Sequence, residues 1–136
     1  MVCIYCGAKT HVTNSRMQRR SRQVWRRRQC FGCRAVFTTE EVVQYALTWM
    51  VVDRDGKFHP FSRDKLFLSI YQCLQHRPNP QQDATELTGT VINRLKPMDV
   101  GAALSPREIV SITQVVLNRF DKVASVQYAA LHKRNY

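Results

Sequence analysis

The pattern of hydrophobic and polar positions divides this chain of 136 residues near residue 45. Before that point, apolar residues occur singly or in pairs among polar and basic ones, which is typical of short β-strands that enclose little core. After it, apolar residues recur every three or four positions, as in amphipathic helices. The sequence therefore predicts an α+β protein with a small strand-rich domain at 1–45 and a mostly helical domain at 46–136.

The second part is predicted to open with a β-hairpin. Trp49 to Val52 and Lys57 to Phe61 are apolar-rich runs, and Asp55-Gly56 separates them. Asp-Gly is a strong hairpin signal, because glycine adopts a positive φ without steric cost. Residues 41–49, which precede the hairpin, are expected to form a connection that is in part a strand.

Four helices are expected after the hairpin. Ser62 is placed to cap the first, which ends by Arg77-Pro78, and Asn79-Pro80 supplies an N-cap and a first-turn proline for the second. Ser105 to Glu108 forms a capping box at the start of the third, and Asp121 is placed to cap the fourth. The faces expected to meet the core are Ile109, Ile112, Val116 and Phe120 in the third helix and Val123, Val126 and Ala130 in the fourth.

Four cysteines in the first part form two CxxC pairs, Cys3 with Cys6 and Cys30 with Cys33. Two such pairs supply the four thiolates of a tetrahedral metal site, and one structural Zn²⁺ is the expected ion. Iron takes the same four ligands, so a redox centre is an alternative that spacing leaves open. Four protein ligands leave no position for a catalytic water. Because the chain also has no triad-like arrangement and no phosphate-binding glycine loop, it is not expected to be an enzyme.

A run of arginines lies between and beside the cysteine pairs, and no acidic residue precedes Glu40. The formal net charge of +11 favours a polyanion as partner. We expect Arg16, Arg26, Arg27 and Arg28 to contact nucleic acid, with alternate arginines of a strand on opposite faces. RNA as the nucleic acid, or an acidic partner protein for some arginines, stays open at this point. The other arginines of the run are Arg19, Arg20 and Arg22.

No apolar run resembles a signal peptide or a transmembrane span, so a cytoplasmic protein without a membrane partner is expected. Thiols stay reduced in that compartment, which argues against two disulfides. The fifth cysteine, Cys73, falls within an apolar helical pattern and is expected in the core.

Two longer motifs together resemble one family. Arg26 to Glu41 reads RRR-x-C-x-x-C-x-x-x-F-T-T-x-E, and Val51 to Phe61 reads V-V-x-R-D-G-x-x-x-P-F. In this order they resemble the NrdR family, bacterial transcriptional repressors of ribonucleotide reductase genes, over nearly the full chain. The resemblance implies a nucleoid-associated protein with a zinc ribbon that binds paired operator boxes in double-stranded DNA. It also implies an ATP-cone that senses ATP or dATP and changes the state of a homo-oligomer.

The same resemblance implies a nucleotide site formed by Val51, Asp53, Arg54, His59, Ser62, Lys65 and Leu66. Arg54 and Lys65 are the expected phosphate contacts. Two residues depart from the family, since Asp53 stands where cone sequences usually carry lysine and His59 where they usually carry glutamate. A carboxylate in place of a phosphate-facing cation would repel the ligand. The alternative interpretation is therefore a zinc-ribbon nucleic-acid-binding protein whose cone is degenerate and insensitive to nucleotide.

Overall fold

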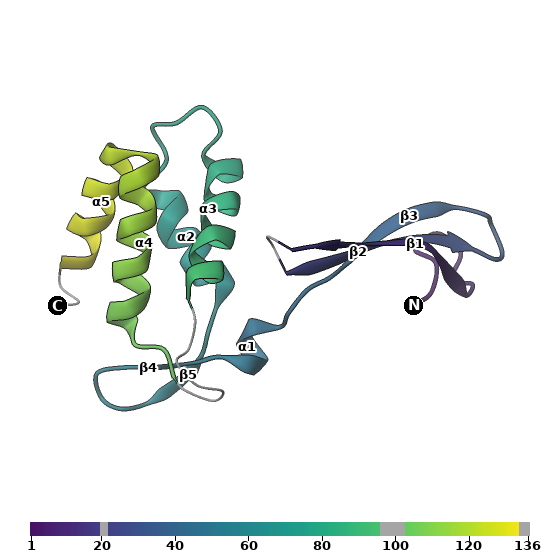
Figure 1. Cartoon of the computed structure of the whole chain (residues 1–136), viewed down its shortest axis with the longest axis horizontal. Helices are drawn as coiled ribbons and strands as arrows, with labels where there is room; N and C mark the ends of the chain where they lie inside the picture. Colours follow the sequence, from purple (N-terminus) through teal and green to yellow (C-terminus); the bar gives the residue numbers. More distant parts are fainter. Residues whose placement is uncertain (20–21, 96–102, 134–136) are drawn as a thin grey trace. The chain divides into compact units, whose positions relative to one another are not determined.

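Figure 1 shows the computed structural model of the chain, which describes residues 1–19, 22–95 and 103–133. Arg20 of the arginine run lies outside these ranges, as do residues 134–136. The chain divides into two compact units, Met1–Val43 and Gln44–Tyr136. The first unit holds a sheet and the second holds mostly helices with a small sheet, which confirms the α+β class. Within the described ranges, no helix is long and apolar enough to cross a bilayer.

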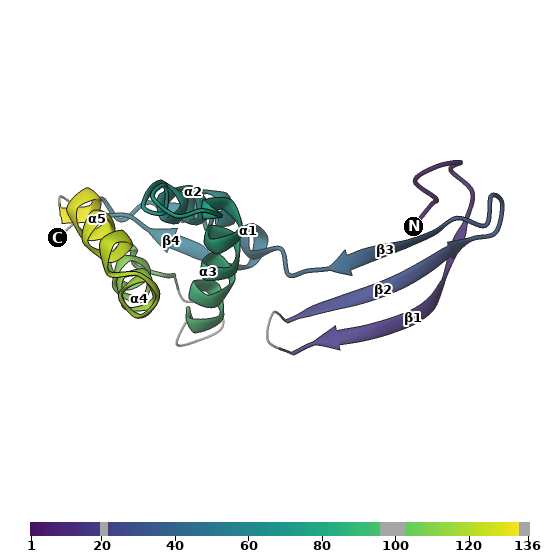
Figure 2. The same cartoon turned by 90° about the horizontal axis from the view of Figure 1, so that it is seen from above.

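The first unit is an antiparallel sheet of three strands in the order β1-β2-β3, which lie side by side in Figure 2. The short strands expected before residue 45 are therefore confirmed. The register between β1 and β2 shifts once, between Val12 and Asn14. The bounds are β1 Thr10–Gln18, β2 Gln23–Cys30 and β3 Val36–Glu41.

This sheet encloses little core. Among the described residues of the first unit, only Cys3 and Cys30 are buried, and even Trp25 is 43% exposed. A three-stranded sheet without a packed hydrophobic face is marginal by itself. The cysteines therefore hold the unit together in place of a core, as in small domains that fold around a metal.

The second unit begins with a short helix and the predicted hairpin. Helix α1 (Tyr45–Thr48) lies within the segment that was expected to be a connection or a strand. Its Tyr45 stacks against Trp49, with ring centroids 4.6 Å apart, and both rings pack on the core. Strand β4 (Met50–Val52) pairs antiparallel with β5 (Phe58–Pro60), and Gly56 takes a φ of 76° in the turn, which confirms the hairpin.

Four helices follow, as predicted: α2 (Arg63–Gln72), α3 (Pro80–Arg94), α4 (Pro106–Phe120) and α5 (Lys122–His132). The side chains of Ser62 and Asp121 cap α2 and α5 by accepting backbone N–H groups. The capping box between Ser105 and Glu108 is closed in both directions. Asn79 occupies the N-cap position of α3 but makes no side-chain capping bond there. Local signals therefore placed all four helix starts.

The core of the second unit lies among the helices, with the hairpin at their end (Figure 1). Phe61, which follows β5, is buried within it. Cys73 is fully buried, as predicted for a core residue. Besides Phe61, the largest completely buried side chains are Ile70, Leu74, Leu95, Leu117 and Tyr128.

The predicted inner faces of α4 and α5 were partly wrong. Phe120 is 42% exposed, with the guanidinium group of Arg77 4.6 Å above its ring, and Leu117 is buried instead. Val123 and Val126 are exposed on α5, whereas Tyr128 is buried. Both helices carry apolar residues on more than one face. Only the packing of α4 between α3 and α5 selects the face that is buried.

Candidate functional sites

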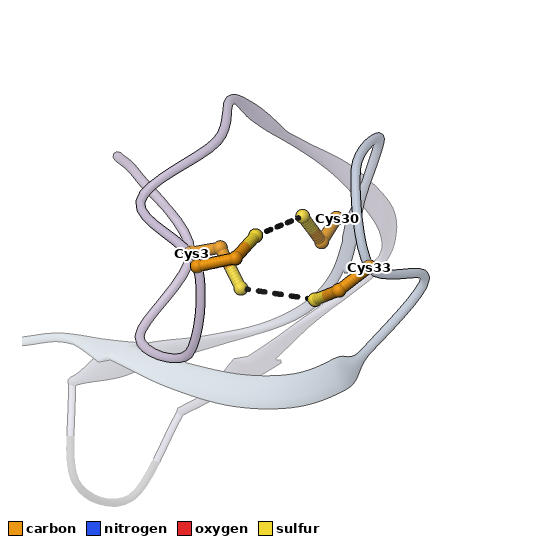
Figure 3. A group of neighbouring side chains, drawn as sticks. Cys3, Cys30 and Cys33 are labelled. Carbon is orange, nitrogen blue, oxygen red and sulfur yellow. Dashed lines mark hydrogen bonds between the residues drawn. The ribbon is translucent and has the colours of Figure 1, made fainter.

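Four sulfur atoms meet between the two loops that carry the cysteine pairs (Figure 3). The Sγ atoms of Cys3 and Cys33 are 3.7 Å apart, those of Cys6 and Cys30 are 3.4 Å apart, and all four lie within 4.8 Å of one another. Around a tetrahedral zinc with Zn–S bonds of about 2.3 Å, neighbouring sulfurs are about 3.8 Å apart. The predicted ligand set therefore fits one structural Zn²⁺.

The two cysteine loops are built alike. In each, the N–H of the first cysteine donates to a carbonyl five residues later, at 2.8 Å and 3.0 Å. The N–H two residues after that cysteine points at its sulfur, at 3.4 Å and 3.3 Å, which stabilises a thiolate. The residue after the second cysteine takes a positive φ, 73° at Gly7 and 63° at Arg34. The repeated geometry presents both sulfur pairs to one point.

The protonation states of the thiols depend on one another. The backbone N–H of Ala8 and the thiol of Cys30 lower the pKa of Cys6 to about 6. The N–H of Ala35 lowers the pKa of Cys33, but the neighbouring thiols and burial outweigh it and raise this pKa to about 11. Four thiolates this close require a compensating positive charge. A divalent cation supplies that charge and releases the protons.

The arginines of β2 alternate between the two faces of the sheet, as predicted. Arg26 donates from Nε and Nη2 to Oε2 of Glu41 on β3, at 2.9 Å and 2.7 Å. Arg28 donates from Nε to Oγ1 of Thr39 at 3.1 Å. Both side chains are half-buried, and part of their hydrogen-bonding capacity is used within the sheet.

The opposite face of the sheet carries exposed cationic and aromatic side chains. Trp25 is paired across the strands with Arg16 of β1, and Arg27 is paired with Asn14 of β1 and Thr38 of β3. These five residues line a hollow of about 240 Å³ and are called the ribbon face below. Two guanidinium groups beside an indole ring form a surface suited to phosphates and bases.

The second unit contains a pocket of about 340 Å³ between the β4–β5 hairpin and the helices α2, α4 and α5, which is called the hairpin pocket below. Its lining includes three basic residues, His59 on β5, Lys65 on α2 and His132 on α5. Its other walls are mostly apolar, and they are formed by Val51, Pro60, Phe61, Ser62, Leu66, Ser69, Pro106, Ile109, Val110 and Tyr128. An apolar pocket lined by a lysine and two histidines suits an anionic ligand that has a large apolar or aromatic body.

A second hollow, of about 760 Å³, lies at the turn of the hairpin and the start of α4. Pro106 lines both this hollow and the hairpin pocket. Arg54 and Arg107 line the second hollow together with the carboxylates of Asp53 and Asp55. Charges of both signs therefore meet beside the hairpin pocket.

Residues 1–41 match a family model described as "Transcriptional repressor NrdR-like, N-terminal domain". Relatives named transcriptional repressor NrdR extend the likeness over 98% of this chain. The one from Psychrobacter cryohalolentis is 33% identical, and the alignment covers 87% of its length. Those from Symbiobacterium thermophilum and Nitrosomonas europaea are each 31% identical, with 87% and 83% of their lengths covered. This chain belongs to the NrdR family.

In this NrdR-family chain, the four arginines predicted to contact DNA lie on two opposite faces of the sheet. Arg16 and Arg27 lie on the ribbon face, whereas Arg26 and Arg28 lie on the other face and bond to β3. Asn14 and Thr38 were not among the predicted DNA contacts, although Thr38 belongs to the F-T-T motif, and strand pairing brings both to the ribbon face. The sequence does not reveal which residues of β1 and β3 lie opposite Arg27, because that depends on the strand register.

The residues that the family resemblance predicts to bind nucleotide line two neighbouring hollows. Five of them line the hairpin pocket: Val51, His59, Ser62, Lys65 and Leu66. Asp53 and Arg54 line the second hollow. Sequence reasoning missed Tyr128 and His132, which come from α5 and stack with ring centroids 4.0 Å apart. Their spacing of four residues was a signal that they share one side of a helix.

Proposed function

We propose that this NrdR-family chain is a zinc-dependent DNA-binding repressor of transcription that acts in the bacterial cytoplasm. The ribbon face binds paired operator boxes in double-stranded DNA, and the regulated genes are those of ribonucleotide reductase. The second unit binds ATP or dATP in the hairpin pocket. The bound nucleotide controls repression by changing the homo-oligomer, and therefore the spacing of the DNA-binding sheets.

The ribbon face is the observation that carries the DNA-binding proposal. Arg16 of β1 is exposed there opposite Trp25, and Arg27 is exposed two residues after Trp25 on β2. The relatives of this chain are named transcriptional repressors, which points to the same role. A β-ribbon fits within the major groove of B-DNA, and the planar fork of arginine matches both phosphate and the edge of guanine. Glu40, opposite Trp25 on β3, marks the edge of this cationic area.

The size and lining of the hairpin pocket support the nucleotide proposal. A volume of about 340 Å³ is within the range of small-ligand sites, and apolar walls beside Lys65 suit an adenine base attached to phosphates. Arg54 and Arg107 of the second hollow place further positive charge near the hairpin. An effector controls an oligomer only if it binds one assembly more tightly than another.

Asp53 favours a second candidate function. Its carboxylate stands near the place where phosphates are expected, so a protein with the same fold that binds DNA without sensing nucleotide is the alternative. Calorimetric titration of the zinc-loaded protein with ATP and dATP separates the two. Heat of binding supports the sensor, and its absence with intact DNA binding supports the alternative.

The DNA-binding proposal is tested with a fluorescent duplex carrying a ribonucleotide reductase promoter and a shuffled duplex of equal length and composition. We expect the zinc-loaded protein to prefer the promoter by about a thousandfold or more in one nucleotide state. Light scattering on the same samples is expected to show different oligomers with ATP and dATP. Equal affinity for both duplexes in every nucleotide state would contradict the repressor function.

A further inference from the structure

The carboxylate of Asp53 is held by three hydrogen bonds at the turn of the hairpin. Its Oδ1 accepts the backbone N–H groups of Asp55 and Lys57, each at 2.9 Å. Its Oδ2 lies 2.9 Å from Nε2 of His59 on the opposite strand. The bond to Asp55 is an Asx turn, in which a side chain replaces a backbone acceptor. Asp53 therefore closes the turn and contacts His59 at the same time.

Because of these contacts, both carboxylate oxygens of Asp53 face partners within the hairpin. The hydrogen bond from His59, followed by the N–H of Lys57, lowers the pKa of Asp53 below its ordinary value of 3.8, so the carboxylate is ionised at neutral pH. Among the described residues, His59 lines the hairpin pocket and Asp53 does not. A ligand in that pocket therefore meets the imidazole of His59 before it meets the carboxylate.

The pair also restricts the proton arrangement of the His59 ring. Nε2 faces the carboxylate of Asp53 and donates its hydrogen to it. Nδ1 is then the ring nitrogen left to meet a ligand. A neutral ring would present a lone pair at Nδ1 and repel an anion. An imidazolium ring donates from both nitrogens, one to Asp53 and one to the anion.

We propose that Asp53 is a positioning residue that orients His59, and that His59 binds a phosphate group of the nucleotide as an imidazolium, together with Lys65. The inference rests on the proposed nucleotide site and names the residues of its phosphate end. Nucleotide binding then takes up a proton at His59, and the affinity rises as the pH falls. The other titratable or charged groups that pair with His59 or line its pocket are Asp53 on the hairpin, Lys65 on α2 and His132 on α5, and the neighbouring hollow adds Arg54, Asp55 and Arg107.

Proton uptake is measured by calorimetric titration of the full-length, zinc-loaded protein with ATP at pH 7.5, in two buffers with different ionisation enthalpies. We expect uptake of up to one proton per nucleotide. His59→Gln is expected to abolish the uptake and to weaken binding by about tenfold, the loss of one charge-assisted hydrogen bond. Asp53→Asn keeps an oxygen that accepts the turn N–H groups but loses the charge, so it is expected to reduce both uptake and affinity.

His76→Gln is the matched control. His76 also pairs with an aspartate in the second unit, since its Nε2 lies 3.1 Å from Oδ2 of Asp121, but it does not line the hairpin pocket. We expect its proton uptake and its ATP affinity to equal those of the natural protein. The control separates an effect at the pocket from a general effect of removing a histidine.

Asp53→Lys distinguishes positioning from simple charge. If Asp53 acted only by repelling phosphate, a lysine at this position would strengthen ATP binding. A lysine cannot accept the N–H groups of Asp55 and Lys57 or orient His59, so we expect ATP binding to weaken. Stronger binding by Asp53→Lys, or proton uptake that persists in His59→Gln, overturns the inference and leaves the nucleotide site standing. No binding of ATP or dATP by the natural protein between pH 6 and 8.5 overturns both.

Discussion

Arg26 and Glu41 are joined across β2 and β3 by an ion pair of 2.7 Å, whereas Arg27, the next residue of β2, is exposed on the opposite face. Neighbouring arginines of one motif therefore differ in whether an acidic residue of the sheet already pairs with them. Arg26 is partly neutralised by Glu41, and Arg28 bonds to Thr39. Their positions in the sheet imply unequal contributions to DNA binding.

We expect Arg27→Ala to weaken binding to promoter DNA more than Arg26→Ala does. If Arg27 contacts one phosphate, its loss reduces the slope of log affinity against log salt by about 0.9. Arg94→Ala, an exposed arginine at the end of α3, is the control and is expected to leave the slope unchanged. Equal losses for Arg27→Ala and Arg94→Ala in titrations at several salt concentrations would place the DNA-binding surface elsewhere.

Removal of zinc is expected to unfold the first unit and to leave the second folded. The first unit buries only Cys3 and Cys30 among its described residues, whereas the second has its own hydrophobic core. A chelator should abolish DNA binding while the helical circular dichroism at 222 nm stays near its starting value. A loss of that helical signal in parallel with zinc release would show that the helical core depends on the metal.

Gly32→Ala is expected to weaken zinc binding. A Cβ at this position would lie 3.1 Å from Cβ of Ala8, which is tighter than most such contacts, so the loop that carries Ala8 would have to shift slightly away from the second cysteine loop. Overpacking of this kind costs about 1–3 kcal/mol. Competition with a chromophoric chelator measures the zinc affinity directly.

Gly89→Ala is the matched control for that substitution. A Cβ at Gly89 meets nothing within 4 Å on α3. Replacing glycine by alanine inside a helix stabilises it by roughly 1 kcal/mol. We expect unchanged zinc affinity and higher thermal stability of the helical signal. Equal zinc affinity in Gly32→Ala and Gly89→Ala would mean that the loops tolerate the added carbon.

Arg34→Gly is expected to tighten zinc binding. Arg34 takes a φ of 63°, a conformation that costs a residue with a side chain about 1–2 kcal/mol. Glycine removes that cost but adds about 0.4–1 kcal/mol of unfolded-state entropy, so the net gain lies between zero and about 1.6 kcal/mol. Gly7→Ala, at φ 73° in the other cysteine loop, should shift zinc affinity the opposite way. Weaker zinc binding by Arg34→Gly would show that the arginine side chain itself supports the site.

Asp121 is expected to make the stability of the helical unit depend on pH. The N–H of Ala124, then His76 and Arg77, lower the pKa of Asp121 from 3.8 to about 2. A carboxylate with a depressed pKa stabilises the folded state above its ordinary pKa, and this contribution is lost as the pH falls through the folded value. The affected range is therefore about pH 4 to 2.

Asp121→Asn keeps a capping oxygen for α5 but removes the charge. We expect lower stability at pH 7 and a smaller further loss between pH 4 and 2 than in the natural protein, measured by urea unfolding at 222 nm. Asp64→Asn, an exposed aspartate in the first turn of α2, is the control. An unchanged pH profile in Asp121→Asn would assign the acid sensitivity to other carboxylates.

The start of α4 could be predicted from the sequence, whereas the contacts of Asp53 could not. The capping box of α4 was predicted correctly, because its donors and acceptors lie within four residues of one another. The buried face of the same helix was predicted only in part, because neighbouring helices select it. Asp53 was interpreted from the sequence as a charge that faces phosphate. Its contact with His59 across the hairpin depends on strand register.

By itself, the sequence determined the features that depend on close neighbours along the chain. These are the two cysteine pairs, the Asp-Gly turn, the helix starts and the alternation of arginines along β2. Covalent geometry and local hydrogen bonds are sufficient to specify them. The tertiary structure decided which arginine meets Glu41, which α5 residues enter the hairpin pocket and where the carboxylate of Asp53 is directed. Each of these contacts joins residues from different strands or helices, so packing and strand register determine it.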